Sequence, residues 1–239
     1  MPEPTTMTRV ARFAMLPLFF MLFLSFAVSQ EGKKYSINTE KADPPKELSD
    51  AIQKLIAPEA IQLLDPTGKA ICDVWLRKEI PADATPEQLK TGVTYREIKQ
   101  TEILGAIRFH RDWTDYRKQR IKAGVYTMRV ALQPTDGKHT ADISDFHDFI
   151  LVINAKGDTK PGLMEPKKLH ETSGDSLALG HPGVFMLWPN YTPGKTPDIA
   201  ARPKNHWVVN SKADLIVGGK NTGKSIGIGI TLVGHSPAE

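Results

Sequence analysis

Apolar and polar residues alternate with a period of two along much of this 239-residue chain, and this alternation restricts its fold most strongly. The pattern is clear at 70–77 and 125–133, and it returns at 226–232. Strands with one buried face show this period, whereas an amphipathic helix repeats every 3.6 residues. Pro and Gly clusters at 65–68 and 134–137 separate the stretches. The sequence therefore predicts short antiparallel strands joined by tight turns.

We expect about nine strands after residue 58, and this number predicts a mainly β fold, an antiparallel β-sandwich or a jelly-roll-like barrel. One stretch has a helical period instead. It begins at Asp43, a candidate N-cap, and ends before Pro58. Its apolar face consists of Leu48, Ile52, Leu55 and Ile56. We therefore expect a polar segment with one short amphipathic helix at 30–58 and a single β domain at 59–239.

The first 29 residues have the layout of a secretory signal peptide. Two arginines precede an almost unbroken apolar run at 13–28, which ends in a small-x-small pattern. The 16-residue run is shorter than the roughly 20 residues that span a bilayer, although an uncleaved anchor is the alternative. We expect cleavage between Ser29 and Gln30 and an exported protein, periplasmic or extracellular. Such a protein meets the membrane only through the signal peptide before cleavage.

Composition excludes several other classes of protein. With 40% apolar and 24% charged residues, the chain is too hydrophobic for a disordered protein and too charged for a polytopic membrane protein. Its single cysteine, Cys72, excludes a disulfide scaffold. Because Cys72 lies on the apolar face of the strand predicted at 70–77, we expect its thiol to be buried. The net charge of +4 is too small to predict a nucleic-acid partner.

The segment from Gly218 to Ser225 matches the phosphate-binding pattern G-x-x-x-x-G-K-[ST]. A loop of this kind must open a helix whose N-terminal amides hold the phosphate groups. The residues that follow alternate with a period of two and are rich in β-branched side chains, which favours a strand. We therefore interpret the segment as a hairpin loop and expect neither a phosphate site nor a nucleotide ligand.

No residue pattern identifies a catalytic nucleophile, and the sequence favours a protein that is not an enzyme. One alternative stays open, because imidazole and carboxylate groups bind divalent metals. The candidate ligands are His110, Asp112, His139 and His147. If these side chains meet at one edge of the fold, they form the site of a metal-dependent enzyme. Otherwise they are ordinary surface groups, and no cofactor is expected.

Several aromatic residues fall in or beside the predicted loops. They are Trp113, Tyr116, Trp188 and Tyr191. Such side chains either stack on sugar rings or cap the edge of the core. The basic segment 111–122 could contact anionic glycans or lipid head groups, but it also contains two aspartates that can pair with its own basic residues.

Five segments carry a resemblance to known proteins. They are VWLRKEI at 74–80, IRFHRDWTDYR at 107–117, IKAGVYTMRVALQPTDGKH at 121–139, DFILV at 148–152 and HPGV at 181–184. Together they resemble an uncharacterised family of secreted bacterial β-rich proteins, and the likeness covers most of residues 60–235. The resemblance implies a one-domain exported protein and identifies no functional residue. We expect a non-catalytic protein that binds envelope polysaccharide or an envelope protein.

Overall fold

Hydrogen bonds join eleven strands into one sheet with the order β1-β2-β3-β5-β8-β9-β10-β13-β12-β11, and β4 pairs with β12 beside this path. The strands are β1 Ser36–Glu40, β2 Ala60–Leu64, β3 Ala70–Leu76, β4 Glu79–Pro81, β5 Ile103–Phe109, β8 Gly124–Leu132, β9 Asp148–Asn154, β10 Gly183–Pro189, β11 Asp198–Arg202, β12 His206–Val217 and β13 Lys220–Val233. All of these pairs are antiparallel except the one between β4 and β12. Strands β6 (Trp113–Thr114) and β7 (Arg120–Ile121) form a separate hairpin.

The computed structural model describes Met1 and residues 34–133, 144–178 and 180–236. The mainly β class predicted from the sequence is confirmed, with 45% strand and 15% helix. The predicted signal peptide, with its cleavage site at Ser29 and Gln30, lies outside the described residues. Residues 33–239 make up one compact unit, to which the rest of this description refers.

The sheet curls around one continuous apolar core, to which each of its eleven strands contributes. The two ends of the strand order approach each other, because the ring of Tyr35, next to β1, lies 5.4 Å from that of Trp207 on β12. Cys72 is fully buried in this core, as predicted, and burial raises the pKa of its thiol. The more detailed prediction of a sandwich or jelly roll is not confirmed.

Strand β10 is the corner at which the sheet turns. Its first half, Gly183 to Met186, pairs with β9, and its second half, Leu187 to Pro189, pairs with β13. The hydroxyl of Tyr95 lies at this corner, donating to the Trp188 carbonyl at 2.9 Å and accepting from the Gly229 amide at 2.9 Å. Tyr95 thereby joins the two strands where they diverge.

The helix predicted after Asp43 is not confirmed over its expected length. Helix α1 spans only Asp50–Gln53, and the side chain of Ser49 caps it by accepting from the Ile52 amide. The earlier residues form turns, although Leu48 and Ile52 are both buried as expected of the apolar face. They pack with Trp75 and Ile103 in a second apolar cluster, so tertiary packing holds this segment with one turn of helix.

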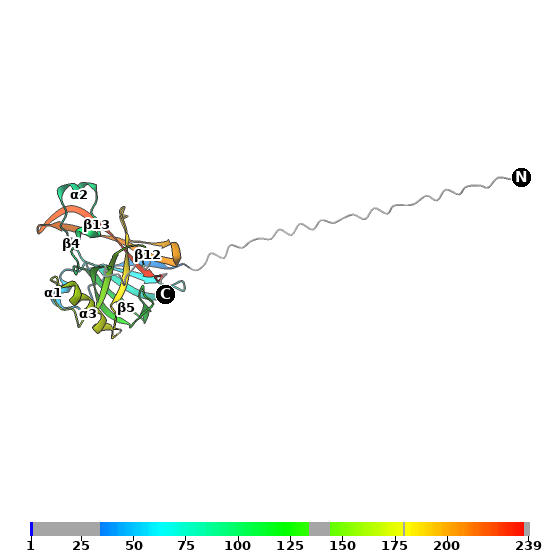
Figure 1. Ribbon diagram of the computed structural model, residues 1–239, viewed down its shortest axis with the longest axis horizontal. Coiled ribbons are helices and arrows are strands. Elements are labelled where there is room, and N and C mark those ends of the chain that lie inside the picture. The colour runs from blue at the N-terminus through cyan, green and yellow to red at the C-terminus, as the bar shows by residue number, and fades with distance from the viewer. Residues whose placement is uncertain (2–33, 134–143, 179, 237–239) are drawn as a thin grey trace. The chain divides into compact units, whose positions relative to one another are not determined.

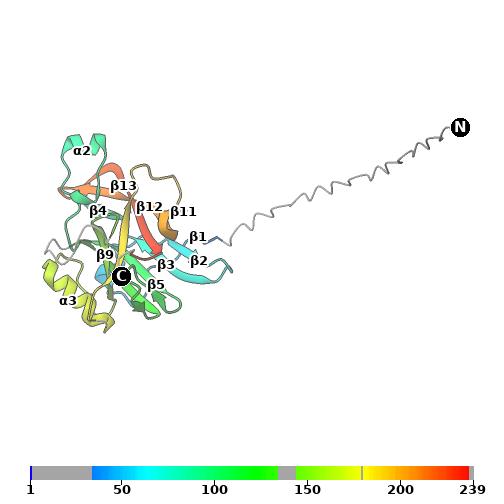
Figure 2. The same ribbon diagram turned by 45° about the vertical axis from the view of Figure 1, so that its right-hand side comes forward.

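Two further helices lie far from each other on the sheet. Helix α2, Pro86–Thr91, lies near β4 and β13 (Figure 1, Figure 2). Helix α3, Pro166–Leu177, was not expected, because its residues carry few apolar side chains. It packs along β9, where the buried hydroxyl of Ser173 donates to the Val152 carbonyl at 2.6 Å. Short 3-10 turns lie at Tyr95–Glu97 (η1) and Pro203–Asn205 (η3).

Candidate functional site

The predicted metal ligands do not come together in the described residues. His110 follows β5 and its Nε2 lies 2.8 Å from Oδ2 of the buried Asp73, whose other oxygen accepts from Gln62 at 3.0 Å. His147 precedes β9 and is exposed. Strand β8 pairs with the end of β5 at Gly124 and with the start of β9 at Leu132. The two histidines therefore lie beyond opposite ends of β8, whose stretch from Gly124 to Leu132 is roughly 27 Å long at about 3.4 Å per residue.

The remaining two candidate ligands, Asp112 and His139, do not complete a metal site with either histidine in the described residues. Asp112 accepts from the Ala123 amide at 2.8 Å and pairs with Arg120, and these contacts hold the pKa of its carboxyl below the usual range. His139 lies outside the described residues. In the part of the chain that the structure describes, no group of three His, Cys, Asp or Glu side chains could hold a metal ion. The described residues among these candidate ligands thus give no support to a metal-dependent enzyme.

The segment that matches the phosphate-binding pattern is part of a β-hairpin. Gly218 and Gly219 are the two central residues between β12 and β13, and both have positive φ values, 57° and 76°. A two-residue turn of this kind needs left-handed backbone at both positions, which glycine adopts without strain. Strand β13 begins directly afterwards at Lys220. No helix N-terminus is present here to hold a phosphate group.

The four predicted aromatic residues fall into two groups. Trp113 is half-buried, donates from Nε1 to the Leu232 carbonyl at 2.8 Å and belongs to the edge of the core. Tyr191 is 76% exposed and lies three residues beyond Trp188. Tyr116 is buried and Trp188 is half-buried, and the ring of His206 contacts both of them. The structure thus brings together two of the four predicted residues through a histidine that the sequence did not single out.

We define the Trp188 cluster by five side chains from separate parts of the chain: Tyr116, Phe146, Trp188, Arg202 and His206. The ring centroid of Trp188 lies 4.9 Å from that of Phe146 and 6.4 Å from that of His206. His206 lies 5.6 Å from Tyr116. The guanidinium carbon of Arg202 lies 5.5 Å from the centre of the Trp188 ring, which is a cation–π distance.

Strand register places Trp188, Arg202 and His206 on one face of the sheet. Arg202 on β11 is directly opposite His206 on β12, and opposite residues of an antiparallel pair project to the same side. Gly229 of β13 pairs with Trp188 on one side and with Asn210 on the other. A Cβ at Gly229 would lie 2.5 Å from the Trp188 carbonyl oxygen, so glycine permits the close approach of β10 and β13 here.

Polar atoms inside the cluster lack partners. His206 is fully buried, and its Nε2 lies 3.0 Å from the His235 carbonyl. Because a carbonyl only accepts, Nε2 carries a hydrogen, and Nδ1 is buried without a partner. The Tyr116 phenol lies near Ser144 but completes no hydrogen bond of normal geometry. Burial raises the pKa of this phenol. Nε of Arg202 is also buried and unpartnered.

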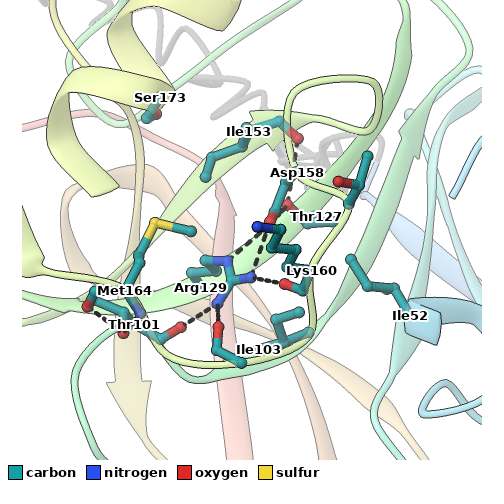
Figure 3. A network of polar contacts seen from close by, with 12 residues as sticks. Ile52, Thr101, Ile103, Thr127, Arg129, Ile153, Asp158, Lys160, Met164 and Ser173 are labelled. Carbon is teal, nitrogen blue, oxygen red and sulfur yellow. Dashed lines mark hydrogen bonds and ion pairs between the residues drawn. The ribbon is translucent and has the colours of Figure 1, made fainter. Parts of the chain in front are cut away.

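A second buried polar network, around Arg129, is complete and therefore structural. The Arg129 guanidinium is fully buried and contacts both oxygens of Asp158, at 2.7 and 2.9 Å (Figure 3). Its remaining donors reach the carbonyls of Thr101, Lys160 and Gly162 at 2.6, 2.6 and 3.1 Å. All five N–H groups of the side chain are used, so this network holds the segment around 158–162 against β8 and offers nothing to a ligand.

Comparisons with protein-family models, with curated proteins and with solved structures give no match for this chain. Within the described part of the chain, no helix is long and apolar enough to cross a membrane. The Trp188 cluster therefore defines a candidate binding site on the chemistry of its own residues. The sequence does not identify Arg202 and His206 as site residues, because neither stands in a recognisable motif. Only strand pairing brings them to Trp188.

Proposed function

We propose that this is an exported, non-catalytic binding protein of the cell envelope, that its ligand is an envelope polysaccharide, and that the Trp188 cluster together with the exposed Tyr191 is the binding surface. The observation that carries the proposal is the pair of accessible aromatic rings at the end of β10, the half-buried Trp188 and the exposed Tyr191. The apolar face of an aromatic ring suits the C–H face of a sugar, and nearby polar groups bind the sugar hydroxyls.

The other features of the cluster support binding better than catalysis. His206 and Tyr116 are the side chains capable of proton transfer, and both are at most 1% exposed. A general acid or base must lie within hydrogen-bond reach of its substrate, and both of these groups are buried instead of lying at the surface. We assign them to the shape and polarity of the site.

A glycan array of bacterial envelope polysaccharides, followed by titration calorimetry with the best oligosaccharide, tests the proposal. Tyr191→Ala is expected to weaken binding by roughly 2–10-fold, the loss expected from removing one stacking ring. Leu163→Ala is the matched control, because Leu163 is an exposed apolar residue (50%) outside the cluster. An array with no signal above background, or an equal loss in both variants, would overturn the proposal.

A further inference from the structure

Three arginines stack on tryptophans in the described residues, and only one of them is without an ion pair. Arg108 lies 5.7 Å from the Trp75 ring and pairs with Glu47 at 3.1 Å. Arg111 lies 5.6 Å from the Trp113 ring and pairs with Asp65 at 2.8 Å. Arg202 has the same stacked geometry on Trp188, but no carboxylate of the described chain pairs with it.

Two carboxylates on elements that neighbour the cluster are already engaged. Asp198 lies four residues earlier on β11 and accepts from Asn210 at 2.7 Å. Asp145 precedes Phe146 of the cluster and pairs with Lys204 at 2.6 Å. Arg202 is half-buried and its Nε is fully buried, so solvent satisfies this donor poorly. A planar anion is the partner that its guanidinium fits, because two parallel N–H groups match two oxygens.

The residue opposite Arg202 adds a second unpartnered polar atom on the same face. His206 lies directly opposite Arg202 across the β11–β12 pair, is fully buried, and has no partner at its Nδ1. Unsatisfied buried polar atoms are rare in folded proteins, and two adjacent ones on one face call for an explanation. A ligand with an anionic group supplies the partner that the half-buried Arg202 lacks, whereas the fully buried His206 adds to the polarity of this face without touching the ligand.

We infer that the polysaccharide is acidic and that Arg202 receives the carboxylate of a sugar acid stacked near Trp188. This inference rests on the proposed function, since it specifies the ligand of the same site. It makes Arg202 the residue that distinguishes acidic from neutral sugars, whereas the aromatic rings bind both.

The test compares a trimer of galacturonic acid with its methyl ester by titration calorimetry. The two probes differ in charge but keep the same rings. The wild-type protein is expected to bind the acid about tenfold or more tightly than the ester, as for a charge-assisted hydrogen bond. Arg202→Gln is expected to bring the two affinities within about twofold, and added salt to weaken acid binding only.

Arg108→Gln is the matched control, because it removes an arginine of equal charge that stacks on another tryptophan. It is expected to keep the preference for the acid, and thermal melts establish that both variants are folded. Equal binding of acid and ester, or loss of the preference in both variants, overturns the inference but leaves the proposed function standing if Tyr191→Ala still weakens binding. Failure of both probes to bind overturns the inference, and a silent glycan array then overturns the proposed function as well.

Discussion

Arg129 is a charged residue whose side chain is fully buried, so its desolvation is costly. The Arg129 side chain is 0% exposed and the Asp158 side chain is 2% exposed. Moving two charges out of water is costly, and the cost is offset only when geometry is good and every remaining donor finds an acceptor. Thr127 completes the arrangement by donating to Asp158 at 2.6 Å. Arg129 and Asp158 are therefore a structural pair in which neither partner is tolerated alone.

Asp158→Asn is expected to lower the free energy of unfolding by about 3–5 kcal/mol, because it leaves the guanidinium charge buried without a counter-charge. Urea denaturation measures the loss. Arg120→Gln is the control, because Arg120 pairs with Asp112 at an exposed site, where such pairs contribute about 0–1 kcal/mol. If the two variants lose similar free energies of unfolding, the burial of the Arg129–Asp158 pair does not make it more important than an exposed pair.

At the scale of elements, the corner at β10 decides how the sheet turns. Tyr95 supplies both a donor and an acceptor between β10 and β13, and its phenol is almost fully buried. Burial raises the pKa of this phenol above its ordinary value near 10, as it does for Tyr116 and Tyr126. The corner is thus stabilised by a neutral hydroxyl.

This shift has a consequence for stability at alkaline pH. Above about pH 10 the phenol of Tyr95 ionises in the unfolded chain but stays protonated in the folded one. The folded state then binds more protons, so the free energy of unfolding falls as the pH rises. Tyr95→Phe is expected to make this fall shallower and to cost about 1–3 kcal/mol at pH 7, through the lost hydrogen bonds. Urea denaturation between pH 7 and 11 measures both effects.

Tyr35→Phe serves as the control for this experiment, because Tyr35 lies next to β1 and packs against Trp207 rather than at the corner. Its pH dependence is expected to follow the wild type. If Tyr95→Phe leaves the alkaline slope unchanged, the buried hydroxyl does not stabilise the corner through its protonated form.

The close approach of β10 and β13 gives a second prediction for this element. Gly229→Ala is expected to destabilise the protein by about 1–3 kcal/mol, because the added Cβ would lie 2.5 Å from the Trp188 carbonyl oxygen and force the strands apart. Gly162→Ala meets no atom within 4 Å and should be nearly neutral. Equal urea midpoints for the two variants would contradict the packing argument.

At the scale of the whole molecule, one core joins all strands of the sheet. Strands β1 and β11 are the two ends of the strand order, and both contribute apolar residues to it. Residues 1–29 contain two arginines followed by an apolar run, whereas much of the rest of the chain alternates apolar and polar residues. Because the first part has the layout of a signal peptide, we expect it to be removed during export.

Expression of the full chain in a bacterial host tests the predicted export. The mature protein is expected in the periplasm or medium with Gln30 as its first residue, and intact mass spectrometry identifies it. Replacing both Ala27 and Ser29 by leucine should block cleavage, because the cleavage site requires small residues. Recovery of the uncleaved wild-type chain in the cytoplasm would contradict the proposal.

Much of the strand content could be predicted because alternation is a local property. The period of two placed strands over β3, β8 and β13 and put Cys72 on the buried face. Helix α3 could not be predicted from the same information. It depends on contacts with β9 such as the Ser173 hydrogen bond, and its own residues favour a helix only weakly.

The candidate site was visible in the sequence only in part. Trp188 and Tyr116 were noted as aromatic residues near loops, but nothing linked them to Arg202. The predicted metal site fails for a related reason. His110 and His147 both flank strands, but strand pairing places them at opposite ends of β8. Residue type shows what a side chain is able to bind, but register determines which other side chains it meets.

Alternation and turn residues were enough to establish a mainly β chain, its buried cysteine and the hairpin at Gly218, because each depends on neighbours within a few residues. The curling of the sheet, the corner at Tyr95 and the placement of Arg202 over Trp188 depended on pairing between strands distant in sequence. A period of two states which face a residue occupies, but it carries no information about which strand lies beside it. For that physical reason the binding site emerged only from the folded chain.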